Sequence, residues 1–282
     1  MAYTSGTAAN YKDLLAVMAT FAAANGWVIK EQSTDKLYLM GTGLAGLDEI
    51  HVGIETYEDS VNGRYNWDMA GAWGWRAGRT LAMQPMSSGN ELANIYLWNA
   101  AIPYWMVATP RRIIVVAKVS NTYQMAYLGL LTPPATDAQY PYPLLVAGTY
   151  YGKAYNYSNP SQNSFWNTGS YQCARISMPG GVWGSISSNA STASNPTVEA
   201  VSANFSSRNA MLTAPDGSYL MEQLYLAEKY NTSILGALEG LFRVSGYNNS
   251  AENIITAEGV NYMVFPDVAK SSYGDYCAMR LN

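Results

Sequence analysis

The sequence predicts an α+β fold that is mainly β, with an N-terminal amphipathic helix packed on antiparallel sheets in a sandwich or jelly-roll-like arrangement. One segment near the N-terminus has helical spacing of apolar residues, many short segments have strand patterns, and residues 98–131 are strongly apolar and β-branched. We expect residues 1–151 to form the helix and a β core, 152–210 a long loop-rich insertion, and 211–282 a C-terminal β segment that completes the core. With 282 residues the chain can bury a large core.

The helix is predicted over residues 7–25. Its apolar face consists of Leu14, Leu15, Met18, Phe21 and Ala22. Thr7 or Asn10 can cap its start, and Asn25 followed by Gly26 can end it. Its opposite face is nearly uncharged, so packing on a sheet is favoured over contact with a membrane.

Short strands are predicted after the helix. They are Trp27–Ile29, Leu37–Met40, Ile50–Ile54 and, with a turn, Asn66–Arg79. Trp67, Trp73 and Trp75 are expected to act as packing anchors. The glycine-rich segment Gly41–Gly46 has no lysine where a phosphate loop needs one, and a strand pattern follows it, so nucleotide binding is not predicted.

Residues 98–131 are expected to form the centre of the core. Ile113–Val116 reads as a strand, and Tyr123–Leu131 as its partner, joined by the tight connection Val119–Thr122. Pro103 predicts that its own segment lies at a sheet edge or bends.

The second half of the chain is predicted to be β-rich on both sides of the insertion. Strands are expected in 144–151, Tyr219–Leu226, Leu235–Val244 and Tyr276–Leu281. A hairpin is expected over Ile254–Phe265, with its turn at Glu258 and Gly259. The segment Tyr276–Leu281 is apolar and is expected to be tied into a sheet. Residues 152–210 are rich in Ser, Asn, Tyr and Gly, and we expect them to carry variable function or to wrap a neighbour.

Composition favours a protein that packs against other subunits. Charged residues make up 13% of the chain and hydrophobic residues 49%, which leaves little charge to keep a bare surface soluble. The chain has 23 Tyr and 8 Trp but only 5 Phe. This excess of aromatics with a polar group suits interfaces that are dry at the centre and wet at the rim, or the half-exposed strands of a β-rich fold. A net charge of −4 without long basic runs predicts no nucleic-acid binding.

Targeting signals and cysteines add two expectations. The first residues resemble no signal peptide and no span of about 18 apolar residues is present, so we expect synthesis in the cytoplasm and no membrane partner. Cys173 and Cys277 are expected to be buried free thiols, although they could pair in an oxidising setting.

Residue chemistry does not predict an enzyme. His51 is the chain's single histidine and is expected to be a strand residue facing solvent or a neighbour. A carboxylate cluster surrounds one strand: Asp48, Glu49, Glu55, Glu58 and Asp59. These groups could serve a cell-wall hydrolase, a hard-cation site or simply the solvated rim of a sheet. We expect no catalytic residue, cofactor or metal, and name Trp166, Tyr171 and Trp183 as candidate interface or ligand aromatics.

Three blocks resemble virion structural proteins of tailed double-stranded DNA bacteriophages. The blocks are Tyr96–Trp105 with Arg112–Val119, Gly41–Ile54, and Gly236–Gly246 with Tyr273–Arg280. The resemblance implies a structural component of the virion, in the tail or baseplate, that contacts other virion subunits as a homo-oligomer or in many copies. It carries fold rather than chemistry, so it implies no catalytic residues.

Two other roles stay open. One is a receptor- or carbohydrate-binding tail module that contacts a host surface glycan through the aromatics of residues 152–210. The other is a head decoration or a neck or collar protein.

Overall fold

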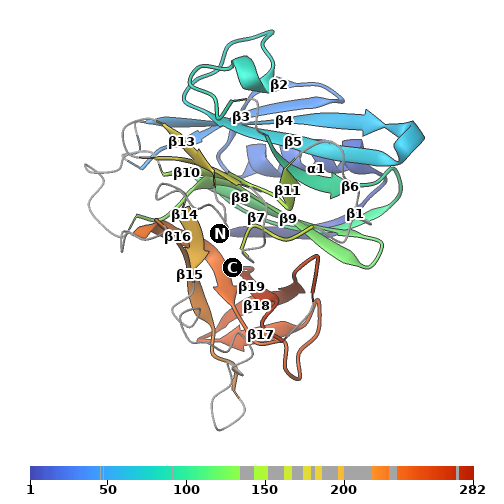
Figure 1. Ribbon diagram of the computed structural model, residues 1–282, viewed down its shortest axis with the longest axis vertical. Coiled ribbons are helices and arrows are strands. Elements are labelled where there is room, and N and C mark those ends of the chain that lie inside the picture. Colours follow the sequence, from blue (N-terminus) through green and yellow to red (C-terminus); the bar gives the residue numbers. More distant parts are fainter. Residues whose placement is uncertain are drawn as a thin grey trace.

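The structure is a computed structural model in which three antiparallel sheets are stacked as layers (Figure 1). It describes residues 1–44, 46, 48–89, 92–133, 143–151, 162–166, 174–178, 182–185, 196–199, 218–228, 234–270 and 273–282. Within these residues the chain is mainly β with one α-helix, which confirms the predicted fold class. The layers number three, one more than a simple sandwich has.

Each sheet is named here by its place in the stack. The N-terminal sheet, at the top of Figure 1, has the order β11 (Tyr150–Tyr151), β6 (Ala93–Leu97), β5 (Arg64–Ala72), β4 (Glu49–Asp59), β3 (Lys36–Thr42), β2 (Val28–Gln32). The middle sheet has the order β1 (Ala2–Ala8), β7 (Ile102–Thr109), β8 (Arg112–Val119), β9 (Thr122–Leu130), β10 (Leu144–Ala147), β12 (Ala174–Ser177), β13 (Trp183–Ser185). The C-terminal sheet has the order β14 (Pro196–Glu199), β15 (Glu222–Glu228), β16 (Ile234–Arg243), β19 (Tyr276–Arg280), β18 (Val260–Pro266), β17 (Ile254–Ala257). Two short 3-10 helices, η1 (Ser60–Asn62) and η2 (Leu81–Met83), lie in connections of the first layer.

The middle sheet is buried on both faces. Along β8, Ile113 and Val115 pack into the core shared with the N-terminal sheet, while Ile114 and Val116 pack into the core shared with the C-terminal sheet. Side chains alternate between the faces of a strand, so a strand between two apolar layers needs apolar residues at every position. This double burial explains the continuous β-branched run at the centre of the sequence.

The helix α1 (Tyr11–Ala24) packs between the N-terminal and middle sheets. Of the predicted apolar face, Leu14, Leu15, Met18 and Ala22 are buried and Phe21 is half-buried. The Asn10 side chain accepts hydrogen bonds from the backbone N–H groups of Lys12 and Asp13, which confirms one of the two predicted caps. The helix ends at Asn25, before Gly26 with φ 90°.

Strand β1 was not predicted from the sequence. Only Ala8 of its seven residues is buried, so it has no apolar periodicity to detect. It forms because β7 offers a partner, in an unbroken register from Ala2 opposite Ala108 to Ala8 opposite Ile102. Of the two alternatives predicted for Pro103, a sheet edge or a bend, the sheet edge is therefore wrong, since β7 lies between β1 and β8. The β7–β8 register begins one residue later, at Tyr104, so the proline precedes that ladder.

The predicted hairpins and the terminal strand are present. Strands β8 and β9 form the central hairpin, with Ser120 at φ 58° in its turn. Strands β17 and β18 turn at Glu258 and Gly259, both at positive φ, as a two-residue hairpin loop requires. Strand β19 pairs with both β16 and β18.

The strands after residue 151 join two different layers. From within residues 152–210, β12 and β13 extend the middle sheet and β14 joins the C-terminal sheet. The strands after residue 218 add a second core against the middle sheet. Of the predicted packing anchors, Trp67 is buried in the core under α1, and Trp73 and Trp75 are half-buried.

Candidate functional site

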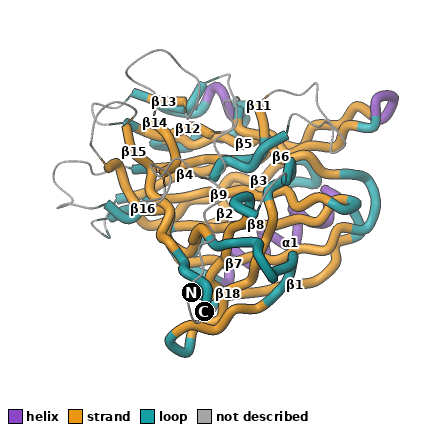
Figure 2. Tube along the Cα trace, turned by 60° about the horizontal axis from the view of Figure 1, so that its bottom comes forward, coloured by secondary structure: helices purple, strands orange, loops and turns teal. Residues whose placement is uncertain are grey.

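The outward side of α1 is an exposed surface without charged side chains after the first turn. The helix contacts β1 at the edge of the middle sheet and β2 at the edge of the N-terminal sheet, so it closes the opening between the two layers. Figures 1 and 2 both place α1 beside β1. We call its outward residues the α1 ridge: exposed Ala16, Thr20, Ala23 and Ala24, with half-buried Val17 and Phe21. No side chain from Leu14 to Gly26 is charged, whereas a surface helix normally has a charged outer face.

Open hollows lie on both sides of the α1 ridge. One of about 470 Å³ separates it from β1, where Thr4 faces Ala16, Val17 and Thr20. The other, of about 670 Å³, lies between the first helical turn and the Gln32–Thr34 turn. The ridge therefore projects between two depressions, a shape that another protein surface can grip.

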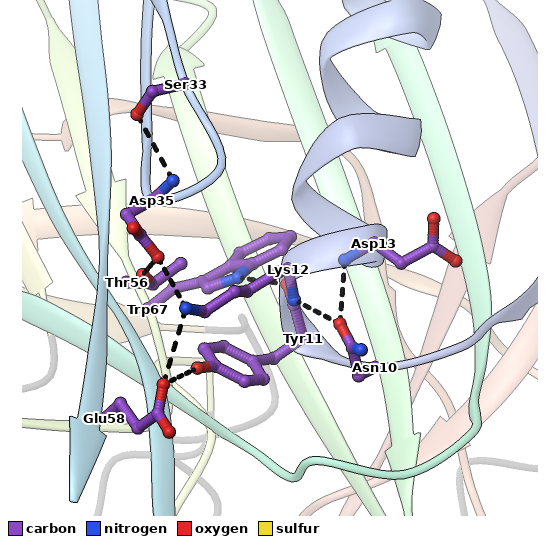
Figure 3. A network of polar contacts seen from close by, with 9 residues as sticks. All are labelled: Asn10, Tyr11, Lys12, Asp13, Ser33, Asp35, Thr56, Glu58 and Trp67. Carbon is purple, nitrogen blue, oxygen red and sulfur yellow. Dashed lines mark hydrogen bonds and ion pairs between the residues drawn. The ribbon is translucent and has the colours of Figure 1, made fainter.

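A polar network fixes the first turn of the helix (Figure 3). The Tyr11 hydroxyl donates to Glu58 Oε2 at 2.6 Å. Lys12 Nζ lies 2.8 Å from Asp35 Oδ1 and 3.4 Å from Glu58 Oε2. The Trp67 indole N–H donates to the Tyr11 carbonyl oxygen at 2.9 Å. These contacts attach α1 to β4, β5 and the turn between β2 and β3.

Each pKa shift in this network moves the pKa further from pH 7. Burial, then the hydrogen bond to Glu58, raises the pKa of Tyr11 to about 12. The hydrogen bond to Asp35 raises the pKa of Lys12, and the same contact lowers that of Asp35. The Tyr11 hydrogen bond lowers the pKa of Glu58. At pH 7 the charges are constant, which suits a structural anchor better than proton transfer.

The predicted carboxylate cluster is not brought together. Glu55 accepts a hydrogen bond from Tyr38 at 2.8 Å and pairs with Lys36, whereas Asp59 caps η1. Glu55 and Glu58 lie three residues apart on β4, so their side chains point to opposite faces. At about 3.3 Å per residue, Glu49 and Glu58 lie roughly 30 Å apart along the strand. Among the residues that the structure describes, no group of three or more His, Cys, Asp or Glu could hold a metal ion.

His51 lies in the interior, which corrects the expectation that it faces solvent or a neighbour. It is 7% exposed and lines a cavity of about 10 Å³, roughly the space of one water, with Tyr38, Trp75 and Gln84. Its Nε2 is 3.5 Å from a Glu49 carboxylate oxygen, and its Nδ1 has no hydrogen-bond partner among the described residues. Burial lowers its pKa, so the ring is neutral at pH 7.

The three candidate aromatics of the insertion do not form one surface. Trp166 is 6% exposed and packs in the core between the middle and C-terminal sheets, so its ring is not available for stacking. Trp183 is half-buried and its indole N–H donates to the Met86 carbonyl oxygen at 2.9 Å, which anchors β13 to the loop before β6. Tyr171 lies outside the described residues.

Of the two cysteines, one lies within the described residues. Cys277 is a buried free thiol, as expected, and burial raises its pKa. Cys173 lies outside the described residues.

An exposed aromatic pair beside the C-terminal sheet was missed from the sequence. Tyr247 and Tyr273 are 39% and 57% exposed, and their rings meet edge to face with centroids 5.6 Å apart. Phe242 and Tyr262 form a second pair on the outer side of the sheet, with centroids 5.3 Å apart. The members of each pair are far apart in the sequence, so no local signal joins them.

Comparison of the chain with protein-family models and with curated proteins found no match. Within the described residues, no helix is both long enough and apolar enough to cross a membrane.

Proposed function

We propose that this chain is a structural component of a bacteriophage virion, in the tail or baseplate, and that it acts by packing against other subunits. The observation that carries the proposal is the α1 ridge beside β1, an exposed and uncharged surface between two hollows. A surface depleted of charged side chains is typical of the centre of a protein contact.

The three blocks that resemble phage virion proteins support the same proposal. They cover the end of β6, the first half of β7 and all of β8, then the end of β3 and the first half of β4, and finally most of β16 and all of β19. These strands supply core residues in all three layers. The resemblance therefore rests on residues that specify the packed body, and the role in a virion is inferred from it.

Polar contacts between layers support a rigid subunit. Lys118 of β8 lies 2.7 Å from Glu252 Oε1, which also accepts a hydrogen bond from the Tyr123 hydroxyl at 2.5 Å. Arg112 pairs with Glu239, and the Thr132 hydroxyl donates to Glu239 at 2.7 Å. Both contacts join the middle and C-terminal sheets, so the layers are connected by ion pairs as well as by their shared core.

The test is to locate the chain in purified particles. An epitope inserted after Val61, which is 93% exposed in η1, leaves the cores intact and can be labelled by immunogold. We expect label at the tail tip or baseplate. Label over the head or neck would keep the structural class and assign a decoration or connector role. Absence of the chain from purified particles by mass spectrometry would contradict the proposal.

A second candidate function is host-surface glycan binding, and the exposed Tyr247–Tyr273 pair favours it. Two aromatic faces near the surface can pack against the apolar face of a ligand. Changing both residues to Ala would then abolish adsorption while leaving assembly intact, whereas changing both to Phe would retain adsorption. Unchanged adsorption of the Ala variant would exclude this pair as the contact.

A further inference from the structure

Strand β1 is an edge strand that lacks the usual protection against pairing. Natural edges carry charges, prolines or bulges, or are very short. The edge strand β2 carries Lys30 and Glu31 and has a register shift there, while β11, β13, β14 and β17 have two, three, four and four residues. In contrast, β1 has seven residues without a charge or a proline, and its register with β7 is unbroken.

The free side of β1 is open to solvent. Tyr3, Ser5, Gly6 and Thr7 are exposed, and β7 is the only strand paired with β1 among the described residues. The backbone groups on the other side of β1 can therefore hydrogen-bond with an added strand.

We propose that a second copy of this chain pairs with the first along β1, antiparallel, so that the two middle sheets become one continuous sheet. This inference rests on the proposed function as an assembled subunit, and it names the surface and the partner. The pairing is two-fold, with the axis perpendicular to the sheet, because this operation reverses the strand direction while keeping each face on the same side.

The two-fold pairing brings the two α1 ridges together. Thr4 and Gly6 lie opposite Met106 and Tyr104, whose side chains belong to the core under the helix, so the even-numbered residues of β1 point to the helix side. An added β1 strand directs its own Ala2, Thr4 and Gly6 into the hollow beside the ridge. Both helices then lie on the same face of the joined sheet with their outward sides turned toward each other. Small residues such as Ala16 and Ala23 allow helices to approach closely.

The chemistry of this surface fits a copy of itself. No residue from Met1 to Tyr11 has a charged side chain, and the α1 ridge has none either. The hollow beside β1 is also lined by exposed Asp13, whose carboxylate accepts a hydrogen bond from the Ala9 N–H at 2.7 Å. Apart from this carboxylate, two copies meet without like-charge repulsion. The polar side chains of β1 and the ridge carry hydroxyls, on Tyr3, Thr4, Ser5, Thr7 and Thr20. A hydroxyl both donates and accepts, so it can pair with the same group of a second copy.

A charge-swap experiment on Ser5 tests the proposal. Ser5 is exposed at the middle of β1, on the side away from the helix, where a long side chain is tolerated in the folded chain. Sedimentation equilibrium of the full chain is expected to show a dimer. S5K alone and S5E alone weaken the dimer by about tenfold or more because like charges face each other across the axis. An equimolar mixture of S5K and S5E restores it. V61K, at the exposed η1 turn, is the matched control and leaves the dimer unchanged.

The outcomes separate this inference from the proposed function. A wild-type monomer at all concentrations, or a dimer that S5K and S5E do not weaken, would overturn the β1 interface. Thermal unfolding of each variant checks that weakening is not loss of fold. Detection of the chain in purified particles tests the virion role independently. A monomeric chain that is found in particles would overturn the β1 interface and leave the virion role in place. A β1 dimer that is absent from particles would support the interface and contradict the virion role.

Discussion

Lys12 Nζ lies 2.8 Å from Asp35 Oδ1, and this ion pair ties the first turn of α1 to the turn between β2 and β3. The contact sets the position of the α1 ridge relative to the N-terminal sheet. We expect K12M to lower the free energy of unfolding by about 0.5 kcal/mol, since both charges are partly exposed to water. Urea denaturation at pH 7 measures this, and an unchanged or higher value would show that the pair does not stabilise the fold.

The same network predicts a pH dependence. The pKa values of Asp35 and Glu58 are lowered in the folded chain, so their contribution is present above the unfolded value of about 4 and is lost as the pH falls through the folded values. The pKa of Lys12 is raised, so its contribution is complete below about 10.4 and is lost only at higher pH. The difference in stability between wild type and K12M should therefore be constant from pH 6 to pH 9 and shrink below pH 4. A difference that grows on acidification would contradict this assignment.

The Tyr11 hydroxyl gives a second test of the anchor. Y11F keeps the ring that packs on Tyr65, whose centroid is 5.4 Å away, and removes only the hydrogen bond to Glu58. We expect a loss of about 1 kcal/mol, which is below the usual range of about 1.5–3 kcal/mol for hydrogen bonds to charged groups, because the site is partly exposed. Absorbance titration of the tyrosines should also lose one group with a pKa of about 12. Loss of a group with an ordinary tyrosine pKa, with the high-pKa group retained, would place that pKa on another tyrosine.

Burial of the middle sheet on both faces predicts that neighbouring residues on β8 are equally sensitive. I113A and I114A should each cost about 2–5 kcal/mol, because each leaves a cavity in a different core. In a two-layer sandwich one of the two residues would face water, and its replacement would cost far less. Equilibrium unfolding of both variants distinguishes the two architectures, with V61A as a surface control.

His51 predicts a loss of stability in weak acid. Its pKa is lowered by burial, so the unfolded chain binds a proton more readily. The stabilising contribution of the neutral ring is therefore present above the unfolded value of about 6.5 and is lost as the pH falls toward the folded value. Thermal unfolding between pH 5 and pH 8 should show this slope in the wild type and a smaller slope in H51Q. Equal slopes would indicate that another group titrates there.

The thiol of Cys277 should be unreactive in the folded chain. It is fully buried and burial raises its pKa, so little thiolate is present and access is blocked. In a C173S background, which leaves this single thiol, a thiol reagent should label the protein only after denaturant is added. Rapid labelling without denaturant would show that the C-terminal sheet opens.

The helix of the candidate site could be predicted from the sequence, but not that its outer face is an exposed surface between two hollows. The uncharged outer face of the helix is a periodic feature, and the cap at Asn10 is a local one, so both were predicted. The ion pairs of Lys12 with Asp35 and Glu58 were not, because they join residues that only the register of β2, β3 and β4 brings together. For the same reason the carboxylates of β4 appeared as one cluster when they lie on opposite faces and along the length of a strand.

The sequence by itself determined the helix, the β8–β9 and β17–β18 hairpins and the terminal strand β19. These elements depend on side-chain spacing, caps and turn residues within a few positions of one another, and such local preferences are written in the chain. Only the tertiary structure decided that the sheets stack in three layers, that His51 and Trp166 are buried, and that β1 is a strand with an open edge. Burial and edge position depend on which distant segments cover a residue, and β1 has almost no apolar pattern of its own, so its existence comes from the strand that pairs with it.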